Sequence, residues 1–486
     1  MSKAETPVAR DLFIGGSYRS SASGKRFETR DPATGEVLAE VAEAGREDLD
    51  AAVQAARASV EGGPWKKMTP RQRGKVLFRA ADLLMSRLDE FARIETRDNG
   101  KPIFESAKID MPACAEALEY FGGFADKVYG RTLPTGAASL LFTLREPIGV
   151  VGAITPWNFP LLQAMWKIAP ALACGNAVVL KPASLTPLTA LLFAEVLSQA
   201  GLPPGAFNVV PGPGEVVGQA MAEHPGIDKI TFTGETETGK KILRAAAGTV
   251  KRVSMELGGK SPNIVFADAD LEAAARGAFN GIFYGKGEVC AAGSRLLVEK
   301  SIHAALVEKL VERAQKSAPA DPLDPKTRLG SLVSEKQRDT VSKYVERGVA
   351  EGAKLVAGGN RRDVGGKGAF FEATVFDSVS PDMEIAKEEI FGPVLATLEF
   401  GTVDEAIALG NRVKYGLAAA VWTRDIKKAL RVAREIQAGT VWINTYNFYD
   451  PGLPFGGYKQ SGFGRERGEE AMHEYTQVKS VWTDLS

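Results

Sequence analysis

An alternation of apolar strands and amphipathic helices, which begins near Ala177, constrains the fold of this chain more than any other feature. Residues 178–180 form a short apolar run, residues 187–200 have the apolar spacing of a helix, and residues 207–210 are apolar again. Two strands joined by one helix form a βαβ unit, in which the strands are parallel. Such units in succession predict a doubly wound parallel sheet. The pattern continues with a helix over 216–223, a strand over 229–233 and a helix that begins near Thr238.

A second α/β region follows Gly258 and Gly259. It begins with a predicted buried strand over 263–266 and a capped helix over 270–278. Because 486 residues exceed what one hydrophobic core usually holds, we expect at least two large domains. Near the end of this region we predict a strand over 417–423, a helix with the apolar stripe Ile426, Ala429, Leu430, Ala433 and Ile436, a stop at Gly439 and a strand over 441–444.

Two segments, residues 127–145 and 474–482, do not fit the alternation. The second alternates apolar and polar side chains, but imperfectly. Both segments are candidates for strands that pair outside the main cores, including between subunits.

Composition narrows the class of partner. Lys and Arg together number 60, and so do Asp and Glu, so there is no overall field to attract polyanions; we expect neither nucleic acid nor a membrane as a partner. Residues 1–10 are polar and unlike a signal peptide, and the most apolar stretch, residues 150–180, is interrupted by three prolines and Lys167. We therefore expect a chain that neither spans a bilayer nor enters a secretory route.

The cysteine content indicates a protein of a reducing compartment, and the histidine spacing indicates that the protein has no metal site. The three cysteines, Cys114, Cys174 and Cys290, are too few and too scattered for a disulfide framework, which suits the cytoplasm. The three histidines lack the spacing of metal ligands, so we expect no bound metal.

The sharpest local feature is Cys290, which is followed by Ala291 and Ala292 and flanked by Gly287 and Gly293. Small neighbours leave space for a substrate at the sulfur, and a cysteine that is deprotonated attacks carbonyl groups. A free cysteine is more often a small, buried, inert side chain. That interpretation suits the other two cysteines, and the residues alone leave both interpretations open for Cys290.

Two further residues have side chains that suit acyl chemistry. Glu256 stands among apolar residues at a predicted strand end, where partial burial would raise its pKa toward that of a general base for water. The alternative is an exposed glutamate or one that is paired with a lysine. Asn158 lies between Pro156 and Pro160, which stiffen the backbone and hold an amide donor where an oxyanion could develop. A simple turn between the prolines is the alternative.

Two turns follow predicted strands, where open α/β sheets bind ligands. Gly234 and Glu235 lie in a turn that opens a helix, so a pyrophosphate could approach the helix N-terminus there. The glycine spacing is not G-x-G-x-x-G, and acids that complement the helix dipole are the alternative. Lys181 lies in the other turn and could reach ribose or phosphate, or it could be an ordinary solvated lysine.

The order of these segments resembles that of the aldehyde dehydrogenase superfamily over essentially the whole chain. The resemblance rests on their combination, since each segment alone is a modest signal. The matching segments are PWNFP (156–160), KPA (181–183), FTG (232–234), ELGGKSP (256–262), the segment around Cys290, EEIFGP (388–393) and PFGGYKQSG (454–462).

The resemblance implies an α/β subunit of three parts that assembles as a homodimer or homotetramer. A Rossmann-like cofactor domain would comprise residues 1–126 and 146–257, and an α/β catalytic domain residues 258–465. A small β oligomerisation arm would comprise residues 127–145 and 466–486. The implied reaction is the oxidation of an aldehyde to the carboxylic acid with NAD, or with NADP, through a thiohemiacetal and a thioester.

The resemblance also assigns roles to individual residues. Cys290 would be the nucleophile, Asn158 and the backbone N–H of Cys290 would hold the oxyanion, and Glu256 would activate water. The aldehyde hydrogen leaves as hydride only when its carbon is tetrahedral and electron-rich. Addition of a thiolate to the aldehyde produces such a carbon, and the reaction needs no metal. The implied cofactor contacts are Lys181 at the adenosine ribose, Gly234 and Glu235 near the pyrophosphate, Glu389 at the nicotinamide ribose, Phe391 beside the nicotinamide, and Thr155, Pro156, Trp157, Ser184, Gly214 and Leu257.

Three positions depart from the pattern of the family. The family often has Gln where this chain has Glu288, and Ser where it has Glu235. Many NAD-preferring members have Glu at the position of Ser184, where its charge would repel the 2′-phosphate of NADP. Serine removes that repulsion, so NADP is a second candidate cofactor.

The matching pocket positions favour an apolar or aromatic aldehyde. They are occupied by Phe159, Trp166, Tyr449 and Phe455. We expect activity on benzaldehyde-like or medium-chain aldehydes to exceed that on betaine aldehyde or succinic semialdehyde. No arginine is evident in these segments to hold a substrate carboxylate, although Arg295 is close to Cys290 in the sequence.

Two other classes of protein are weaker interpretations. A thiol hydrolase or acyltransferase would use Cys290 but would need a histidine partner, and none is placed by the sequence. A structural or binding protein that had lost the enzymatic function would lack the cysteine or the base, and both are present.

Overall fold

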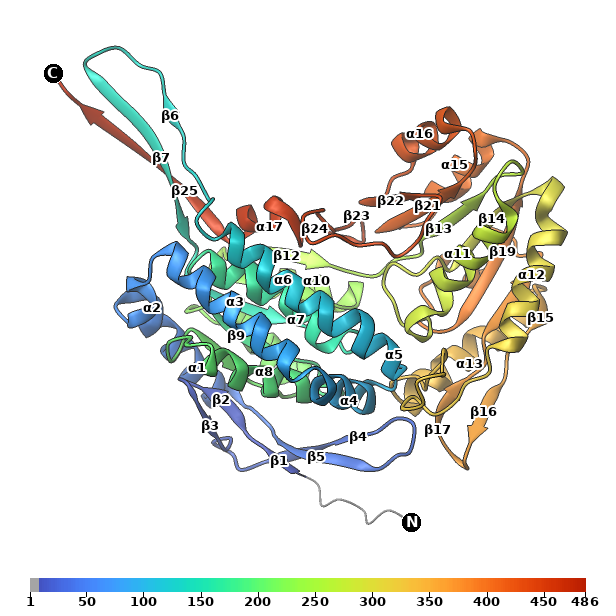
Figure 1. The fold of residues 1–486 in the computed structure, drawn as a ribbon, viewed down its shortest axis with the longest axis horizontal. Coiled ribbons are helices and arrows are strands. Elements are labelled where there is room, and N and C mark those ends of the chain that lie inside the picture. The colour runs from blue at the N-terminus through green and yellow to red at the C-terminus, as the bar shows by residue number, and fades with distance from the viewer. Residues whose placement is uncertain (1–7) are drawn as a thin grey trace.

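Two large sheets organise the chain, in a computed structural model that describes residues 8–486. Figure 1 shows them in two bodies, the first mainly blue to green and the second yellow-green to red-orange, with a small sheet that projects from the first body. No helix within residues 8–486 combines the length and the apolar character needed to cross a membrane.

The first sheet has the strand order β24-β12-β11-β8-β9-β10-β2-β3. Strands β8 to β12 are parallel, which confirms the predicted doubly wound sheet. The chain runs from β8 outward to β9 and β10, then returns to β11 and β12, so the strand order reverses between β8 and β11. The strands are β2 Leu12–Ile14, β3 Ser17–Arg19, β8 Val150–Ile154, β9 Ala177–Lys181, β10 Phe207–Val209, β11 Lys229–Thr233, β12 Arg252–Glu256 and β24 Gly462–Phe463.

Both faces of the first sheet are covered by helices. In β9, Val178 and Leu180 pack into the core with α7 and α8, and Ala177 and Val179 pack into the core with α1 and α9. A strand buried on both faces must be apolar at successive positions, which is why its sequence is recognisable. The helices of this body are α1 Arg46–Glu61, α2 Pro64–Lys67, α3 Pro70–Ser86, α4 Leu88–Asn99, α5 Ile103–Glu105, α6 Met111–Phe124, α7 Pro160–Ala173, α8 Leu188–Gln199, α9 Gln219–Glu223 and α10 Thr236–Ala246.

The helix predicted over 216–223 differs in its first turn. It begins as a π-helical turn, η2 (Gly214–Gly218), and only then continues as α9. The helix expected near Thr238 begins two residues earlier, at Thr236.

The second sheet has the order β15-β18-β19-β14-β13-β21-β22 and is parallel except at the edge strand β15. It confirms the second α/β region and its predicted strands. The strands are β13 Pro262–Val265, β14 Arg295–Glu299, β15 Lys354–Ala357, β18 Thr374–Asp377, β19 Val394–Phe400, β21 Ala418–Trp422 and β22 Thr440–Ile443, and the helices are α11 Leu271–Phe283, α12 His303–Lys316, α13 Glu335–Ala350, α14 Glu384–Lys387, α15 Val403–Asn411 and α16 Ile426–Glu435.

The apolar stripe predicted for α16 is partly wrong. Ile426 and Leu430 are 62% and 42% exposed, whereas Ala429, Val432 and Ile436 are buried. The helix covers the edge of the sheet with a narrow face, so only a narrow line of side chains enters the core.

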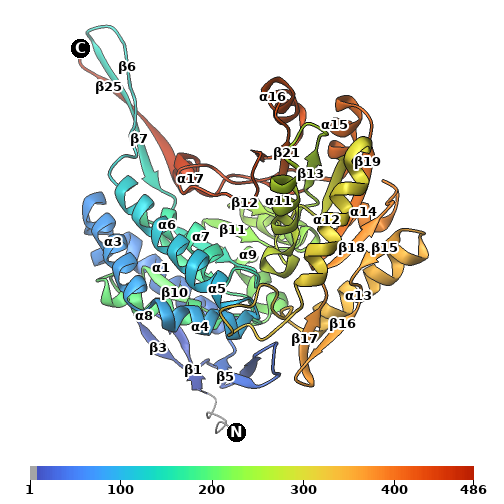
Figure 2. The same cartoon turned by 45° about the vertical axis from the view of Figure 1, so that its right-hand side comes forward.

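The two segments that do not fit the alternation form a separate sheet, as predicted. Strand β25 (Thr476–Asp484) pairs with β7 (Ser139–Pro147) in antiparallel register, and β6 (Thr132–Leu133) adds to β7. Figures 1 and 2 both show this three-stranded sheet extending away from the rest of the molecule.

Smaller elements complete the fold. Strand β24 returns to the first sheet and pairs with β12, and helix α17 (Gly468–Glu474) packs against α7. The remaining strands are β1 Val8–Arg10, β4 Arg26–Arg30, β5 Val37–Ala42, β16 Arg361–Val364, β17 Lys367–Phe371, β20 Tyr415–Gly416 and β23 Tyr458–Lys459.

Candidate active site

The residues predicted to bind a cofactor gather at one edge of the first sheet. Thr155 follows β8, Lys181 ends β9, Gly234 follows β11 and Leu257 follows β12. These are the carboxyl ends of parallel strands, at the point where the strand order reverses, and open α/β sheets bind ligands at this place. The turns of the same strands also contain Pro156, Trp157, Ser184 and Glu235, and Gly214 begins η2 beyond β10.

The polar groups at this edge fit a ligand rich in oxygen atoms. The Lys181 ammonium is buried, donates a 3.1 Å bond to the adjacent Pro182 carbonyl, and has its pKa lowered to about 8 by loss of solvent. The Thr155 hydroxyl is buried and has no hydrogen-bond partner within the described residues. Ser184 donates to the Gly212 carbonyl at 2.9 Å, and Glu235 is exposed, so its charge faces solvent. This donor set fits the ribose and phosphate groups of a dinucleotide.

Glu389 and Phe391 reach the same edge from the second body. The Glu389 carboxylate accepts a 2.9 Å bond from the Gly259 N–H, and burial raises the pKa of Glu389 to about 7. A Cβ on Gly258 would lie 2.2 Å from a Glu389 oxygen, so only glycine allows this approach. The Phe391 ring meets Trp157 edge to face, with 5.1 Å between ring centroids. Both contacts join the two bodies at the candidate cofactor site.

Cys290 lies in the loop between the turn η4 (Tyr284–Gly287) and β14. It is partly exposed, whereas Cys114 and Cys174 are buried. Its sulfur lines a cavity of about 710 Å³. Loss of solvent and the carboxyl groups of Glu389 and Glu256 raise the pKa of the Cys290 thiol to about 12. All four predicted substrate residues, Phe159, Trp166, Tyr449 and Phe455, line the same cavity.

Asn158 is tied to the Cys290 loop. It is buried just before α7, and its Nδ2 donates a 2.9 Å hydrogen bond to the backbone carbonyl of Glu288, two residues before the cysteine. A primary amide has two N–H groups, so the second is available to another acceptor.

Glu256 is the last residue of β12, and its side chain is buried. Neither carboxyl oxygen has a hydrogen-bond partner within the part of the chain that the structure describes. Burial, followed by the nearby Glu466, raises the pKa of Glu256 well above its usual range, and Lys167 opposes the rise. A carboxyl group in this setting is poised for proton transfer.

The Lys167–Glu466 ion pair beside Glu256 is a feature that the sequence analysis missed. The buried Lys167 ammonium contacts the Glu466 carboxylate and donates to the Thr233 hydroxyl at 2.6 Å. One signal was present in the sequence, because Lys167 is a charged residue inside the otherwise apolar α7. A fully buried lysine is rare without a partner.

A closed circuit of hydrogen bonds and one ion pair connects the turn at Asn158 with the loop at Cys290. Lys286 pairs with Glu288 at 2.8 Å and donates to the Asn99 side-chain oxygen at 2.7 Å. The Asn99 amide donates in turn to the Trp157 carbonyl at 2.8 Å, and Asn158 closes the circuit onto Glu288. The circuit fixes the amide relative to the sulfur.

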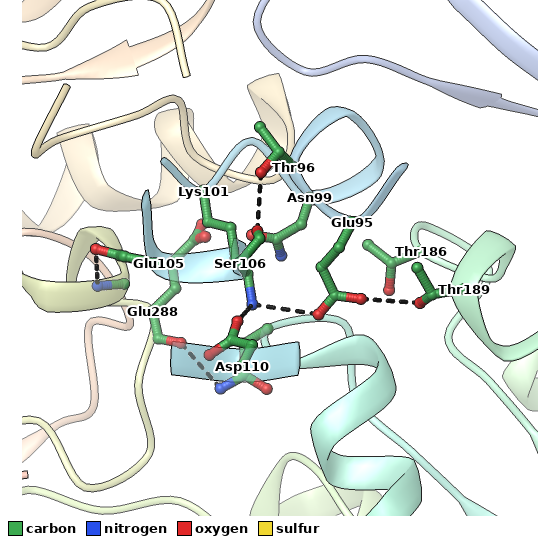
Figure 3. Close-up of polar contacts among 12 residues, drawn as sticks. Glu95, Thr96, Asn99, Lys101, Glu105, Ser106, Asp110, Thr186, Thr189 and Glu288 are labelled. Atoms are coloured by element: carbon green, nitrogen blue, oxygen red, sulfur yellow. Dashed lines mark hydrogen bonds and ion pairs between the residues drawn. The ribbon is translucent and has the colours of Figure 1, made fainter. Parts of the chain in front are cut away.

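A second buried polar cluster lies next to this circuit. Figure 3 shows Lys101 between two carboxylates: its Nζ lies 2.6 Å from Asp110 and 3.5 Å from Glu95. Glu95 also accepts a 2.8 Å bond from Thr189. Glu105, which lines the cavity, accepts from the Gly285 N–H at 3.2 Å, and burial and Asp110 raise its pKa to about 7. The cluster is buried structural support, and the sequence analysis did not detect it.

The structure corrects the expectations about arginine. The guanidinium of Arg295 donates to the backbone carbonyls of Lys260, Leu409 and Gly410, so it supports the backbone and does not line the cavity. Arg467 does line the cavity, close to Trp166 and Tyr449. The sequence analysis saw no arginine in the pocket because Arg467 lies outside the matching segments.

Comparison with known proteins agrees with this geometry. The profile of the Aldehyde dehydrogenase family matches residues 18–481. Retinal dehydrogenase 2 of Mus musculus is 50% identical, with 97% of this chain and 91% of that protein covered. Retinaldehyde dehydrogenase 3 of Homo sapiens is 48% identical, with 98% and 93% covered.

Solved structures give the same result. The structure of an aldehyde dehydrogenase from Bacillus cereus in complex with NAD+ is 47% identical, has a TM-score of 0.97, and covers 98% of this chain and 97% of its own. The P. syringae indole-3-acetaldehyde dehydrogenase AldA, solved with NAD+ and IAA, is 46% identical with a TM-score of 0.97, and covers 99% and 98%. The chain therefore belongs to the aldehyde dehydrogenase family, whose reaction is the oxidation of aldehydes to carboxylic acids with a nicotinamide cofactor.

Proposed function

We propose that this protein oxidises an aldehyde through a thioester on Cys290, with Asn158 as the oxyanion donor and Glu256 as the base. One observation carries the assignment: of the three cysteines, Cys290 alone is partly exposed and lines the large aromatic cavity. Two further observations support it: the carboxyl group of Glu256 acts electrostatically on the Cys290 thiol, and the amide of Asn158 is bonded to the backbone carbonyl two residues before Cys290.

The first chemical step needs a deprotonated sulfur. The raised pKa of Cys290 means that the resting side chain is a thiol, so a base has to take its proton. The Glu256 carboxylate is the group placed to do so. The thiolate then forms a C–S bond to the aldehyde carbon, and the carbonyl electron pair moves to the oxygen. The second N–H of Asn158 and the backbone N–H of Cys290 stabilise this oxyanion.

The thioester follows when the oxyanion collapses and the carbon loses a hydride. Bound nicotinamide dinucleotide supplies the acceptor for this hydride. Glu256 first releases to solvent the proton that it took from Cys290. Its carboxylate then removes a proton from water, the hydroxide adds to the thioester carbon, and the C–S bond breaks, so that Cys290 leaves as a thiolate and the acid is released. The absence of hydrogen-bond partners for the Glu256 oxygens among the described residues leaves them available to a water molecule.

The cofactor contacts are part of the same proposal. We place the adenosine ribose at Lys181, the pyrophosphate at Gly234 and the nicotinamide ribose at Glu389, with NAD+ as the cofactor and NADP+ as a second candidate. The unpartnered Thr155 hydroxyl and the desolvated Lys181 ammonium support this placement. The presence of Ser184 supports the proposal that the protein also accepts NADP+, because serine adds no negative charge beside the 2′-phosphate.

The cavity supports the expected substrate class. The side chains of Phe159, Trp166, Tyr449 and Phe455 surround a space of about 710 Å³, which suits an aromatic or medium-chain aldehyde. We propose that such aldehydes are better substrates than betaine aldehyde or succinic semialdehyde.

Assembly is a further part of the proposal. The three-stranded sheet of β25, β7 and β6 projects from the body and exposes Leu140, Leu144, Val478 and Trp482, the last at 75%. Exposed apolar side chains on a protruding sheet edge are typical of a subunit contact, which supports a homodimer or homotetramer.

We propose the oligomerisation arm at residues 127–145 and 466–486, the cofactor domain at 1–126 and 146–257, and the catalytic domain at 258–465. A cytoplasmic location is proposed from the three free cysteines.

A direct assay tests the proposed chemistry. Purified protein with NAD+ and benzaldehyde should produce NADH, detected by absorbance, and Cys290→Ala should abolish it while the thermal melt is unchanged. Iodoacetamide should label Cys290 in preference to Cys114 and Cys174, as seen by peptide mass spectrometry. NADH formation by Cys290→Ala would contradict the proposal, and ester hydrolysis without any NADH would indicate a thiol hydrolase.

A further inference from the structure

Arg467 is an unusual component of the substrate cavity. It precedes α17, is only 7% exposed, and lines the cavity together with Cys290. Its guanidinium carbon lies 5.0 Å from the centre of the Trp166 ring and 5.3 Å from that of Tyr449. Aromatic faces attract the cation, but they accept none of its N–H groups in a normal hydrogen bond.

The hydrogen-bond donors of Arg467 are unused within residues 8–486. The guanidinium forms no hydrogen bond or ion pair with a residue of this range, and its nitrogens are not among the fully enclosed polar atoms that lack a partner, so they keep some access to the cavity. Of the acids that act on it at longer range, Glu466 is paired with Lys167, and Asp450 and Glu116 are exposed. Donors that are free and face a cavity are available to a ligand that brings acceptors.

The backbone at Arg467 is held in a rare conformation. Its φ of 66° and ψ of 170° fall in a region that is essentially restricted to glycine. Such conformations persist only where the surrounding contacts impose them, and they concentrate at ligand sites. Here the conformation directs a long cationic side chain to the cavity, in place of the glycine that the backbone would favour.

The other charged groups that line the cavity differ from Arg467. Arg328 donates to the carbonyls of Pro325 and Thr327, and Lys108 is exposed to solvent. Glu105 is bonded to the Gly285 N–H and has a pKa near neutrality, so it is partly uncharged at pH 7. Glu116 also lines the cavity, but it is negatively charged and exposed to solvent. Arg467 therefore combines burial, positive charge and unused donors in a way that none of these four does.

Tyr449 connects Arg467 with the reacting sulfur. Its ring lies 5.3 Å from the guanidinium carbon, and Cys290, Tyr449 and Arg467 line the same cavity. A flat molecule with its aldehyde carbon at Cys290 and its body along Trp166 and Tyr449 would bring its opposite end to the guanidinium.

We propose that Arg467 binds a carboxylate at the end of the substrate remote from the aldehyde. This inference rests on the proposed function and narrows its substrate class to aromatic aldehydes that carry a carboxylate. Arginine is suited to the role because its planar fork donates two parallel hydrogen bonds to one carboxylate. The aromatic lining binds the body of the substrate, and the guanidinium favours substrates that carry a negative charge at the remote end.

The test compares two aldehydes of similar size in three forms of the protein. Wild type should have a kcat/KM for 4-carboxybenzaldehyde about 10- to 100-fold above that for 4-methylbenzaldehyde, the range expected for hydrogen bonds to a charged group. Arg467→Met, which keeps the stem over Trp166, should remove this preference mainly through KM, and Arg467→Lys should restore part of it. Equal losses for both aldehydes would show that Arg467 acts only in packing, and would overturn the inference.

Binding without turnover separates this inference from the proposed function. Calorimetric titration of the full-length protein with terephthalate and with 4-methylbenzoate should show a preference for terephthalate in wild type that Arg467→Met loses. Oxidation of 4-methylbenzaldehyde without any preference for the carboxylate would refute the role of Arg467 alone. Absence of NADH with every aldehyde, with the terephthalate preference intact, would refute the proposed chemistry but not the carboxylate site.

Discussion

The side-chain amide of Asn158 donates a 2.9 Å hydrogen bond to the backbone carbonyl of Glu288, two residues before Cys290. One N–H of the amide is thus fixed, and its geometry determines where the second N–H points. The bond converts a flexible amide into an oriented donor beside the sulfur.

Replacement of Asn158 by alanine tests this arrangement. Asn158→Ala should lower kcat by about 10²–10³-fold, the usual loss for one oxyanion donor. The KM for NAD+ should change little, because the cofactor contacts are elsewhere, and a thermal melt controls for folding. A kcat within twofold of wild type would show that the amide does not act on the oxyanion.

Glu256→Gln should separate the two halves of the reaction. The glutamine cannot activate water, so steady-state turnover should fall by about 10²–10⁴-fold. If Cys290 still adds to the aldehyde at high pH, stopped-flow absorbance should show a burst of one NADH for each subunit before the slow phase. Intact-protein mass spectrometry should find the acyl group on Cys290. Steady-state turnover equal to that of wild type would rule out Glu256 as the base for water.

The affinity for NAD+ should depend on pH through Glu389. Burial raises the pKa of Glu389 to about 7, so the group is neutral below that pH and a carboxylate above it. A carboxylate is a stronger acceptor for ribose hydroxyls, so the KM for NAD+ should fall about tenfold as the pH rises from about 6 to about 8. Glu389→Gln, which does not titrate, should flatten the profile. A wild-type profile without this change would argue against Glu389 as the ribose ligand.

The Lys286–Glu288 ion pair should show strong coupling in stability. Both side chains are buried, and Glu288→Gln leaves the lysine charge without its partner, so the free energy of unfolding should fall by about 3 kcal/mol. The double variant Lys286→Gln with Glu288→Gln should recover most of this loss, because no unpaired charge is left. Denaturant titration of the four forms measures the coupling. Additive losses would mean that the pair is energetically independent.

Ser184 should control the choice of cofactor. Ser184→Glu should lower kcat/KM for NADP+ about 100-fold, since the carboxylate would face the 2′-phosphate. Activity with NAD+ should be retained. Ser184→Gln is the matched control, because it has the same size without the charge and should keep NADP+ activity close to wild type. A similar loss in both variants would indicate a steric effect rather than charge.

Local composition was enough to predict the strands and the order of the candidate segments along the chain. Strand β9 is apolar at successive positions because both of its faces are buried, so its identity depends on local composition and not on distant contacts. Cys290, Glu256 and Asn158 were candidates for a related reason, since small, apolar or proline neighbours mark each of them within a few residues. Their local sequences alone left structural interpretations open, and the combination of segments that resembles the family assigned their roles.

Packing between distant segments sets which of these local features meet, and which other residues meet them. The circuit through Asn99, Lys286 and Glu288 joins residues almost two hundred positions apart, and Arg467 reaches the cavity from a segment that resembles no pocket sequence. The exposed side of α16 could likewise not be predicted, because the side chains that are buried depend on how the helix packs on the sheet. Local patterns record the faces of single elements, whereas a buried charge acquires its partner, its pKa and its role from whichever distant segment packs against it.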